Sequence, residues 1–327
     1  MSGIIHSVLN PAVYHGHHKR PPFFEGWYYK LVSKDGQDRV AVIPAVILGE
    51  EGHAFIQILD GAEMKMDYHT FPLSSFHAAK KKFDVRISNN TFNLSGMRLD
   101  LSIESGGASG EICLGEPAPW PVSLTSPGVM GWYAWVPAME CYHGVLSFDH
   151  AVSGVLELNG RTIDFNGGRG YLEKDWGASF PEGYIWLQTN HFQKQGISLM
   201  ASVAVIPWLG SAFPGFIIGL LLENKLWRFA TYTGAKLEEF AITDEAVQLV
   251  VSDRQNRLQI EASRVQGVSL KGPTKTKMGL RVDESLAGRA AVRLSNTEGE
   301  VLFEGTGVHA GMEVIRPENL LNWTGRI

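Results

Sequence analysis

Short runs in which apolar and polar residues alternate recur along the chain, and turn residues separate them. This pattern is typical of β-strands with one buried face. Four segments hold two such runs joined by a turn, and we predict a β-hairpin in each: 83–105, 153–165, 246–265 and 290–305. The second of these contains an Asn-Gly turn, a strong hairpin signal. No long stretch has helical periodicity, so the chain is predicted to be all-β.

One stretch, 196–222, carries no charged residue over 27 positions and is long enough to cross a bilayer as a helix. Its middle, however, is interrupted by Pro207, Gly210, Pro214 and Gly215. Residues of this kind end regular elements. We therefore expect two buried strands joined by a turn rather than a transmembrane helix.

The chain partly repeats itself. Residues 23–29 (FFEGWYY) and 180–186 (FPEGYIW) share the frame Phe-x-Glu-Gly-aromatic-x-aromatic, and two apolar runs follow each copy. The repeat predicts two β-rich halves, residues 1–178 and 179–327, each a barrel or a sandwich. A barrel of about eight strands can hold one small apolar ligand in its mouth.

The repeat fails at one informative place. Residues 165–177 (FNGGRGYLEKDWG) correspond to 303–314 (FEGTGVHAGMEV), which lack the Glu-Lys-Asp-Trp block. In an extended strand Glu173 and Asp175 point to the same side as Tyr171, while Lys174 points to the other. The two carboxylates would lie about 6–7 Å apart. Facing an aromatic-lined pocket, one of them would have a raised pKa and serve as a proton donor. The alternative is that these charges pair with others at a domain junction.

Composition narrows the function classes. The chain is 44% hydrophobic and 19% charged, with a formal net charge of −5, which excludes a disordered chain and gives no basic footprint for nucleic acid. The lysines at 80–82 fit a solvated strand edge. Cys113 and Cys141 are too few for a disulfide framework and are expected to be buried free thiols. The N-terminus resembles neither a signal nor a transit peptide, so we expect a cytoplasmic protein.

The sequence lacks the motifs for metal binding, nucleotide binding and nucleophile-elbow catalysis. His15, His17 and His18 have no acidic or cysteine partner at a ligand spacing, so we expect no metal. The GGRG run at 167–170 leads into a predicted strand instead of a helix, which removes a nucleotide site. No nucleophile elbow is present.

Three quoted segments resemble the tocopherol cyclase family: FFEGWYYK (23–30), residues 131–165, and YLEKDWGASFPEGYIWLQTN (171–190). The resemblance implies two lipocalin-like β-barrels, a distant relation to carotenoid hydratases, and closure of a chromanol ring in a prenylated hydroquinone without an organic cofactor. The chain departs from the plant pattern at Asp175, where plant members have Asn, and at Ala178 and Ser179, which replace two glycines. The long insertion between the first hairpins of plant members is also absent.

On this reading an alkene accepts a proton and a phenol oxygen captures the resulting cation. We expect Glu173 to be the acid, with Asp175 second, and His143 to deprotonate the phenol. Aromatic faces would stabilise the cation. The candidates that bind substrate are Trp27, Tyr29, Trp132, Trp135, Tyr171, Trp176 and Trp186, with Glu25 as a secondary candidate. Packing in a core, or a structural role for Glu25 and His143, is the alternative for each.

Two functions of different classes remain open. One is a cofactor-independent cyclase, or a related alkene-protonating enzyme, acting on a prenylated lipid or another polyene. The other is a non-catalytic carrier of a terpenoid, quinone or other apolar ligand. For both functions we expect an apolar small-molecule partner and no nucleic acid. We also expect peripheral contact with a membrane, from which the protein would collect a lipid. Only the enzyme needs a carboxyl group in its apolar site.

Overall fold

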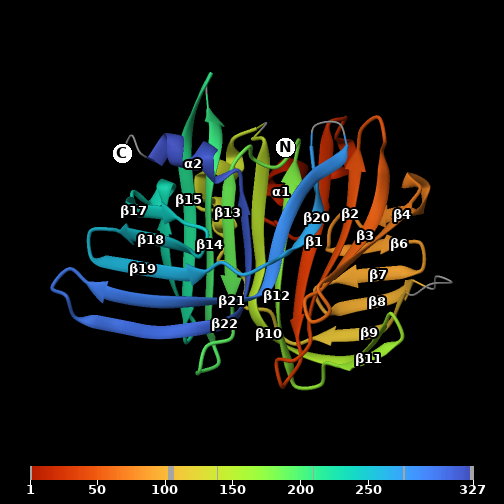
Figure 1. The fold of residues 1–327 in the computed structure, drawn as a ribbon. Coiled ribbons are helices and arrows are strands. Elements are labelled where there is room, and N and C mark those ends of the chain that lie inside the picture. Colours follow the sequence, from red (N-terminus) through yellow and green to blue (C-terminus); the bar gives the residue numbers. More distant parts are fainter. Residues whose placement is uncertain (1, 102–106, 138, 209, 275–276, 325–327) are drawn as a thin grey trace. The chain divides into compact units, whose positions relative to one another are not determined.

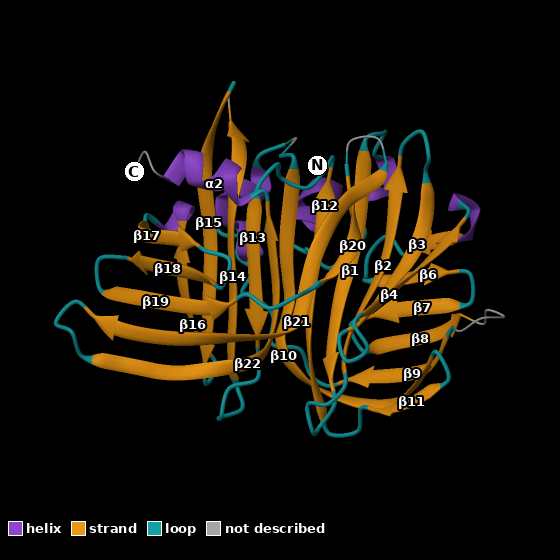
Figure 2. Ribbon diagram, in the orientation of Figure 1, coloured by secondary structure: helices purple, strands orange, loops and turns teal. Residues whose placement is uncertain are grey.

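The computed structural model describes residues 2–101, 107–137, 139–208, 210–274 and 277–324. Nearly all of this is β-structure, in one sheet of twelve strands and one of ten (Figures 1 and 2). Contacts divide the chain into two compact units. Unit 1 comprises Met1–Phe180 and Leu270–Arg281, and unit 2 comprises Pro181–Ser269 and Val282–Ile327.

The first sheet has the order β4-β3-β2-β1-β12-β10-β9-β8-β7-β6-β5, with β11 paired to β10. Its strands are β1 (Phe23–Val32), β2 (Arg39–Leu48), β3 (His53–Asp60), β4 (Lys65–Phe71), β5 (Phe76–Ala78), β6 (Asp84–Ile87), β7 (Asn90–Asn93), β8 (Gly96–Leu101), β9 (Ala108–Leu114), β10 (Cys141–Leu158), β11 (Arg161–Asp164) and β12 (Gly168–Gly177). The helical segments before and between them are α1 (Ser2–Val8), η1 (Gly16–His18), η2 (Leu73–Ser75) and η3 (Gly128–Trp135).

The second sheet has the order β16-β15-β14-β13-β22-β21-β19-β18-β17, with β20 paired to β21. Its strands are β13 (Tyr184–Thr189), β14 (Ile197–Trp208), β15 (Ser211–Leu222), β16 (Lys225–Ala230), β17 (Lys236–Ile242), β18 (Ala246–Ser252), β19 (Asn256–Ser263), β20 (Val268–Pro273), β21 (Met278–Asn296) and β22 (Val301–Ile315). The short helix η4 (Thr231–Thr233) follows β16, and α2 (Pro317–Thr324) ends the described chain.

The predicted strand pairs are confirmed, with one addition. The uncharged stretch forms β14 and β15, an antiparallel pair, and no helix in the described residues is both long and apolar enough to cross a membrane. Residues 84–101 form three strands rather than two, because a second turn separates Asn93 from Gly96. Of this predicted hairpin, residues 102–105 lie outside the described residues.

The repeat is visible in the topology. In the first sheet β1 lies between β2 and β12, and β10 follows; in the second, β13 lies between β14 and β22, and β21 follows. The two Phe-x-Glu-Gly copies lead into β1 and β13, which occupy equivalent places. The segment with the Glu-Lys-Asp-Trp block and its counterpart without it likewise occupy equivalent strands, β12 and β22.

Unit 1 wraps its sheet around a core. In Figure 1 strands β6 to β9 run across the direction of β1 to β3. The long strand β10 takes part in both directions because register shifts at Val145/Ser147 and Ser147/His150 bend it. Further along β10, Gly154 has φ +117, and a Cβ there would lie 2.1 Å from the Glu111 carbonyl oxygen, so the close approach to β9 requires glycine.

Unit 1 has one apolar core. Large rings at its centre are fully buried, among them Trp27, Tyr29, Phe92 and Phe165. They belong to one cluster with aliphatic residues from nearly every strand of the sheet.

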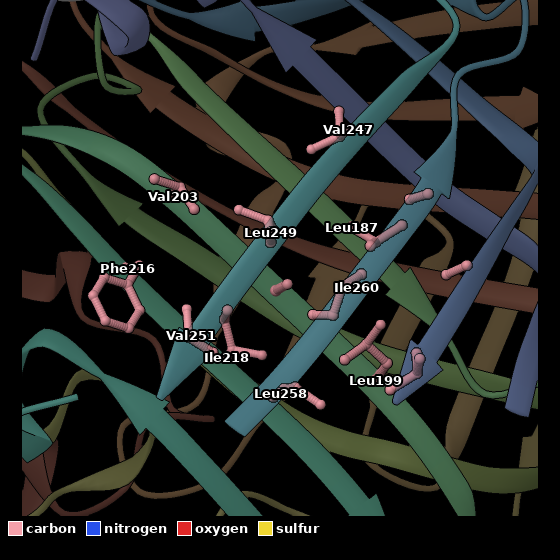
Figure 3. Close-up of a cluster of buried hydrophobic side chains, with 14 of the residues drawn as sticks. Leu187, Leu199, Val203, Phe216, Ile218, Val247, Leu249, Val251, Leu258 and Ile260 are labelled. Atoms are coloured by element: carbon pink, nitrogen blue, oxygen red, sulfur yellow. The ribbon is translucent and has the colours of Figure 1, made fainter. Parts of the chain in front are cut away.

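Unit 2 has its own apolar core, part of which Figure 3 shows. Strands on two sides contribute to it: Leu187, Leu199, Val203, Phe216 and Ile218 come from β13 to β15. The labelled residues from β18 and β19 are Val247, Leu249, Val251, Leu258 and Ile260. This core buries the apolar side chains that alternate with polar ones in the predicted strands.

The cysteine prediction is half correct. Both cysteines are free, but Cys113 is exposed, and Cys141 is intermediate in exposure. Cys113 lies in β9 on the side opposite its buried neighbour Ile112, so the strand's alternation directs it outward.

Candidate acid–base site

Strand β12 lies at the centre of the first sheet, with β1 and β10 as antiparallel neighbours. Across these pairs Asp175 lies opposite His143 of β10, and Glu173 lies opposite Val145. On the alternate positions Lys174 lies opposite Trp27 of β1. The predicted alternation of side chains along β12 is therefore present, and the strand has two chemically different faces.

Glu173, Asp175, His143 and Tyr171 lie together as two neighbouring hydrogen-bonded pairs, which we call the acid cluster. The Tyr171 hydroxyl donates to Glu173 Oε2 at 2.6 Å, and His143 Nδ1 lies 2.8 Å from Asp175 Oδ1. His143 Nε2 lies 3.4 Å from Glu173 Oε2. The Glu173 residue is only 4% exposed, whereas the Asp175 side chain is 25% exposed. The cluster is thus buried at Glu173 and reaches solvent at Asp175.

The imidazole between the carboxylates is charged at neutral pH. Burial alone would lower the pKa of His143, but the charges of Asp175 and Glu173 and the hydrogen bond to Asp175 outweigh it and raise the pKa to about 9. Burial and the nearby Glu173 charge raise the pKa of Tyr171 well above its ordinary value, so its hydroxyl remains a donor. By formal charge, two carboxylate side chains and one imidazolium give the acid cluster one net negative charge.

One polar atom of the acid cluster is left without a hydrogen bond. His143 Nε2 is buried and has no hydrogen-bond partner within the described residues, although Glu173 Oε2 is nearby. Buried polar atoms are nearly always satisfied, and exceptions are concentrated at functional sites. The protonated Nε2 is therefore a free donor beside a buried carboxylate.

The acid cluster also has the spacing of metal ligands, because one ligand atom from each of His143, Glu173 and Asp175 lies within 4.8 Å of the others. His143 Nδ1 lies 2.8 Å from Asp175 Oδ1, so a metal ion bound here would replace this hydrogen bond and displace the proton of the imidazole. The same three side chains therefore suit either proton handling or metal binding.

The opposite face of β12 carries a second charged group, which we call the lysine cluster. Lys174 is fully buried, and its Nζ lies 2.7 Å from Glu25 Oε1 and 2.8 Å from His15 Nδ1. It also donates to the Val13 carbonyl oxygen. These are three acceptors for the three ammonium hydrogens. The indole of Trp176 lies 4.5 Å from Nζ and adds a cation–π contact.

The remaining groups of the lysine cluster are satisfied as well. The backbone N–H of His15 donates to both Glu25 oxygens, at 3.1 and 2.8 Å. Because His15 Nδ1 accepts from Lys174, its Nε2 carries the hydrogen and donates to the Ser7 carbonyl oxygen at 3.2 Å. Burial and then Lys174 lower the pKa of His15, which keeps the ring neutral. Burial lowers the pKa of Lys174 to about 8, opposed by Glu25.

The predicted aromatic residues are distributed among several places. Trp27 and Tyr29 are fully buried in the core of unit 1, on the lysine face of β12. Trp176 is stacked between His15 and Tyr142, with centroids 4.3 and 5.5 Å away. Such positions suit packing and support of Lys174 rather than contact with a cation formed at Glu173.

Three other predicted positions lie elsewhere. Trp132 and Trp135 belong to η3 and are 44% and 36% exposed, and Trp135 donates to the Leu124 carbonyl oxygen. Trp186 lies in β13 of unit 2 and is buried. Of the predicted aromatic residues, Tyr171 contacts Glu173 directly, as a hydrogen-bond donor.

Sequence reasoning missed the partner of Lys174. Glu25 was a secondary substrate-binding candidate because its Glu-Gly frame recurs, yet it forms a buried ion pair with Lys174. Its counterpart Glu182 is exposed. No signal in the sequence indicated this pair, because the glutamate recurs in the second repeat as Glu182 whereas the lysine does not.

Comparison with known proteins decides the family. Residues 118–315 match the model of the tocopherol cyclase-like family, and this range includes the whole acid cluster. The chain belongs to that family. The resemblance found in the sequence motifs is thereby confirmed, including the part of the chain after residue 190, which those motifs did not reach.

Curated plant relatives match parts of this chain. A probable chloroplastic tocopherol cyclase of Oryza sativa subsp. japonica is 28% identical over 158 residues, which are 47% of this chain and 33% of the relative. The chloroplastic tocopherol cyclase of Zea mays is 24% identical over 196 residues, 56% of this chain and 41% of the relative. The matched segments thus span less than half the length of either relative.

A solved structure extends the comparison to nearly the whole fold. Kievitone hydratase from Nectria haematococca superposes with a TM-score of 0.52 at 12% identity, covering 92% of this chain and 93% of its own. At that identity the likeness concerns the fold. Together with the two sheets described above, it supports an all-β architecture of lipocalin-like domains related by an internal repeat.

Proposed function

We propose that the protein is a cyclase of the tocopherol cyclase type, which closes a chromanol-type ring in a prenylated hydroquinone. The single observation that carries the proposal is the acid cluster: a buried carboxylate, Glu173, held by the Tyr171 hydroxyl beside the His143–Asp175 pair. Membership of the tocopherol cyclase-like family supports the class of reaction.

The charge balance of the acid cluster explains how it could supply a proton. Two carboxylates and one imidazolium leave one net negative charge, and the imidazolium neutralises Asp175 through a direct hydrogen bond. When an apolar substrate displaces water from Glu173, the cost of the unbalanced buried charge rises. Uptake of one proton by Glu173 removes it. A neutral carboxylic acid then faces the substrate, as the reaction requires.

The reaction needs only that proton. Glu173 transfers it to the less substituted carbon of the prenyl double bond, which forms a C–H bond and a tertiary cation. The phenol oxygen attacks the cation and closes the ring, and the phenolic proton returns to the Glu173 carboxylate. Product and substrate have the same atoms, so no oxidant or reductant is consumed.

The role of His143 differs from the one expected from the sequence. The neighbouring carboxylates raise the pKa of His143 to about 9, so the proposal assigns it a role in its protonated form. In the proposal its Nε2–H instead orients the attacking phenol oxygen or the Glu173 carboxylate, to which it lies 3.4 Å away. The substrate partitions into bilayers, so the protein would collect it by peripheral contact with a membrane.

The deciding experiment compares Glu173→Gln with Glu182→Gln, the exposed glutamate at the Glu-Gly frame of the second repeat. A hydroquinone with a C20 prenyl tail is incubated with each protein under nitrogen, and the chromanol is detected as a product of unchanged mass and different retention. We expect Glu173→Gln to lose about 10²- to 10⁴-fold in turnover. Glu182→Gln should remain as active as the unmodified chain.

Binding of the same hydroquinone, followed by tryptophan fluorescence, separates the two functions left open by the sequence. Retained binding with lost turnover in Glu173→Gln supports the acid assignment. Turnover at the native rate in that variant shows that Glu173 is not the acid. Tight binding without any chromanol from the unmodified chain would favour the carrier.

A further inference from the structure

Unit 2 contains a hollow of about 1070 Å³ that none of the functional reasoning above uses. It is lined by the connection between β13 and β14, by the hairpin between β15 and β16, and by the first half of β22. Its size is in the range of small-molecule sites. The hollow is lined by residues of unit 2 and shares none with the acid cluster, which belongs to unit 1.

The inner wall of the hollow is apolar and continuous with the core of unit 2. Phe192 and Ile197 belong to that core, and Leu222, Trp227 and Phe303 pack against it. The rings of Phe192 and Phe303 meet edge to face, with centroids 5.8 Å apart.

A glycine in β22 keeps this wall close-packed without filling the hollow. A Cβ at Gly305 would lie 2.9 Å from the ring of Phe303 and 3.6 Å from that of Phe192. A side chain at this position would displace the Phe303 ring, whereas the Phe192 ring lies at an ordinary contact distance. The wall thus offers aromatic and aliphatic surface to an apolar ligand.

The rim of the hollow is charged, with an excess of cations. Lys194 is paired with Glu223, and Lys225 lies over the Trp227 ring, 3.6 Å from its centroid. Arg289 is exposed at the rim, and its guanidinium has no hydrogen-bond or ion-pair partner among the described residues. With Glu304 as the other acid on the lining, three basic and two acidic side chains leave one net positive charge.

We propose that this hollow binds an amphiphile with one negative charge, of the long-chain carboxylate class. The apolar tail lies against Phe192, Trp227 and Phe303, and the carboxylate is held at the rim by Arg289, whose planar guanidinium suits bidentate contact with a carboxylate. The ligand differs from the uncharged hydroquinone of the proposed reaction, so this site extends the protein's function beyond that reaction.

The test is calorimetric titration of the full chain with octanoate, decanoate and dodecanoate, below their micellar concentrations. Because each buried methylene adds apolar surface, we expect the affinity to rise about fourfold per added CH₂. Arg289→Ala should weaken dodecanoate binding about tenfold. The matched control is Arg293→Ala, four residues further along β21 on the same face, also exposed but absent from the lining.

A second pair of variants tests the location without altering a buried residue. Leu302 lines the hollow and is 40% exposed, whereas its neighbour Val301 is 41% exposed and does not line it. Leu302→Asp should weaken dodecanoate binding by at least tenfold through repulsion and lost apolar contact. Val301→Asp should leave the affinity within about twofold.

Titration with dodecanol tests the role of the charge, because dodecanol has the same alkyl chain as dodecanoate without the negative charge. It should bind more weakly than dodecanoate to the unmodified chain and be insensitive to Arg289→Ala. The proposal is overturned if no carboxylate binds, if affinity is independent of chain length, or if the members of either matched pair lose affinity equally. None of these titrations depends on turnover, and Glu173→Gln should bind dodecanoate normally, so failure here and failure of the proposed reaction are distinguishable.

Discussion

Glu173 and Lys174 are consecutive in the chain, but the polar groups around them differ in how completely they are hydrogen-bonded. In the lysine cluster every ammonium hydrogen has an acceptor, and both Glu25 oxygens accept hydrogen bonds. In the acid cluster the protonated His143 Nε2 has no hydrogen bond within the described residues. The Asp175 side chain is also partly exposed.

The difference indicates what each cluster does. A fully satisfied buried network fixes a local structure, because any rearrangement leaves a charge without a partner. Here it fixes the segment before β1, since Val13 and His15 are both bound to it. A cluster with an unfilled donor and unequal exposure retains capacity for another molecule. We infer that the lysine cluster stabilises the fold and that the acid cluster carries the chemistry.

The largest effect should come from Lys174→Met. The change leaves Glu25 charged at a fully buried position without its cation, which should lower the free energy of unfolding by about 3–5 kcal/mol. Urea unfolding at neutral pH measures it. Glu173→Gln, one residue away, is the control and should cost less than about 1.5 kcal/mol. Equal losses in the two variants would contradict the division of roles.

Because of the acid cluster, we expect the free energy of unfolding to depend on pH. The pKa of His143 is about 9 in the folded chain against an ordinary value of 6.5. The folded state holds the proton more tightly, so the stabilisation is complete below pH 6.5 and is lost as pH rises through 9, a difference of about 3 kcal/mol. In His143→Asn this fall should be absent, so the two proteins should differ most at pH 6 and least at pH 10. A constant difference across that window would show that the imidazole is not charged.

The alternation of residues 171–176 predicted which side chains of β12 share a face, because strand geometry is local. The hairpins and the uncharged strand pair were predictable for the same reason. The residues that face each side of β12 could not be predicted, since they depend on neighbours far away in sequence. Glu25 and Lys174 meet only because β1 and β12 are antiparallel partners. Trp27 and Tyr29 were therefore assigned to the acid, whereas the register places them on the lysine face.

Replacing both partners of the buried pair sharpens the comparison. Lys174→Met combined with Glu25→Leu removes the orphaned carboxylate, so the double variant should recover about 2 kcal/mol relative to Lys174→Met alone. The hydrogen bonds from the backbone of His15 to Glu25 are lost as well, so recovery should be incomplete. Urea unfolding of the unmodified chain, Lys174→Met, Glu25→Leu and the double variant gives the coupling energy. A double variant no more stable than the single one would mean that packing, and not the unpaired charge, causes the loss.

A small effect on stability is expected for Tyr171→Phe, which removes the buried hydroxyl that donates to Glu173. A hydrogen bond to a charged group contributes about 1.5–3 kcal/mol, and the loss should be near the lower end because His143 still stabilises the carboxylate. Without the donor the carboxylate is less stabilised and takes up a proton at higher pH. The limb of the pH–rate profile that reports the acid should therefore shift upward in Tyr171→Phe. A purely structural tyrosine would lower stability and leave that limb in place, so the profile, rather than the unfolding energy, decides whether Tyr171 tunes the acid.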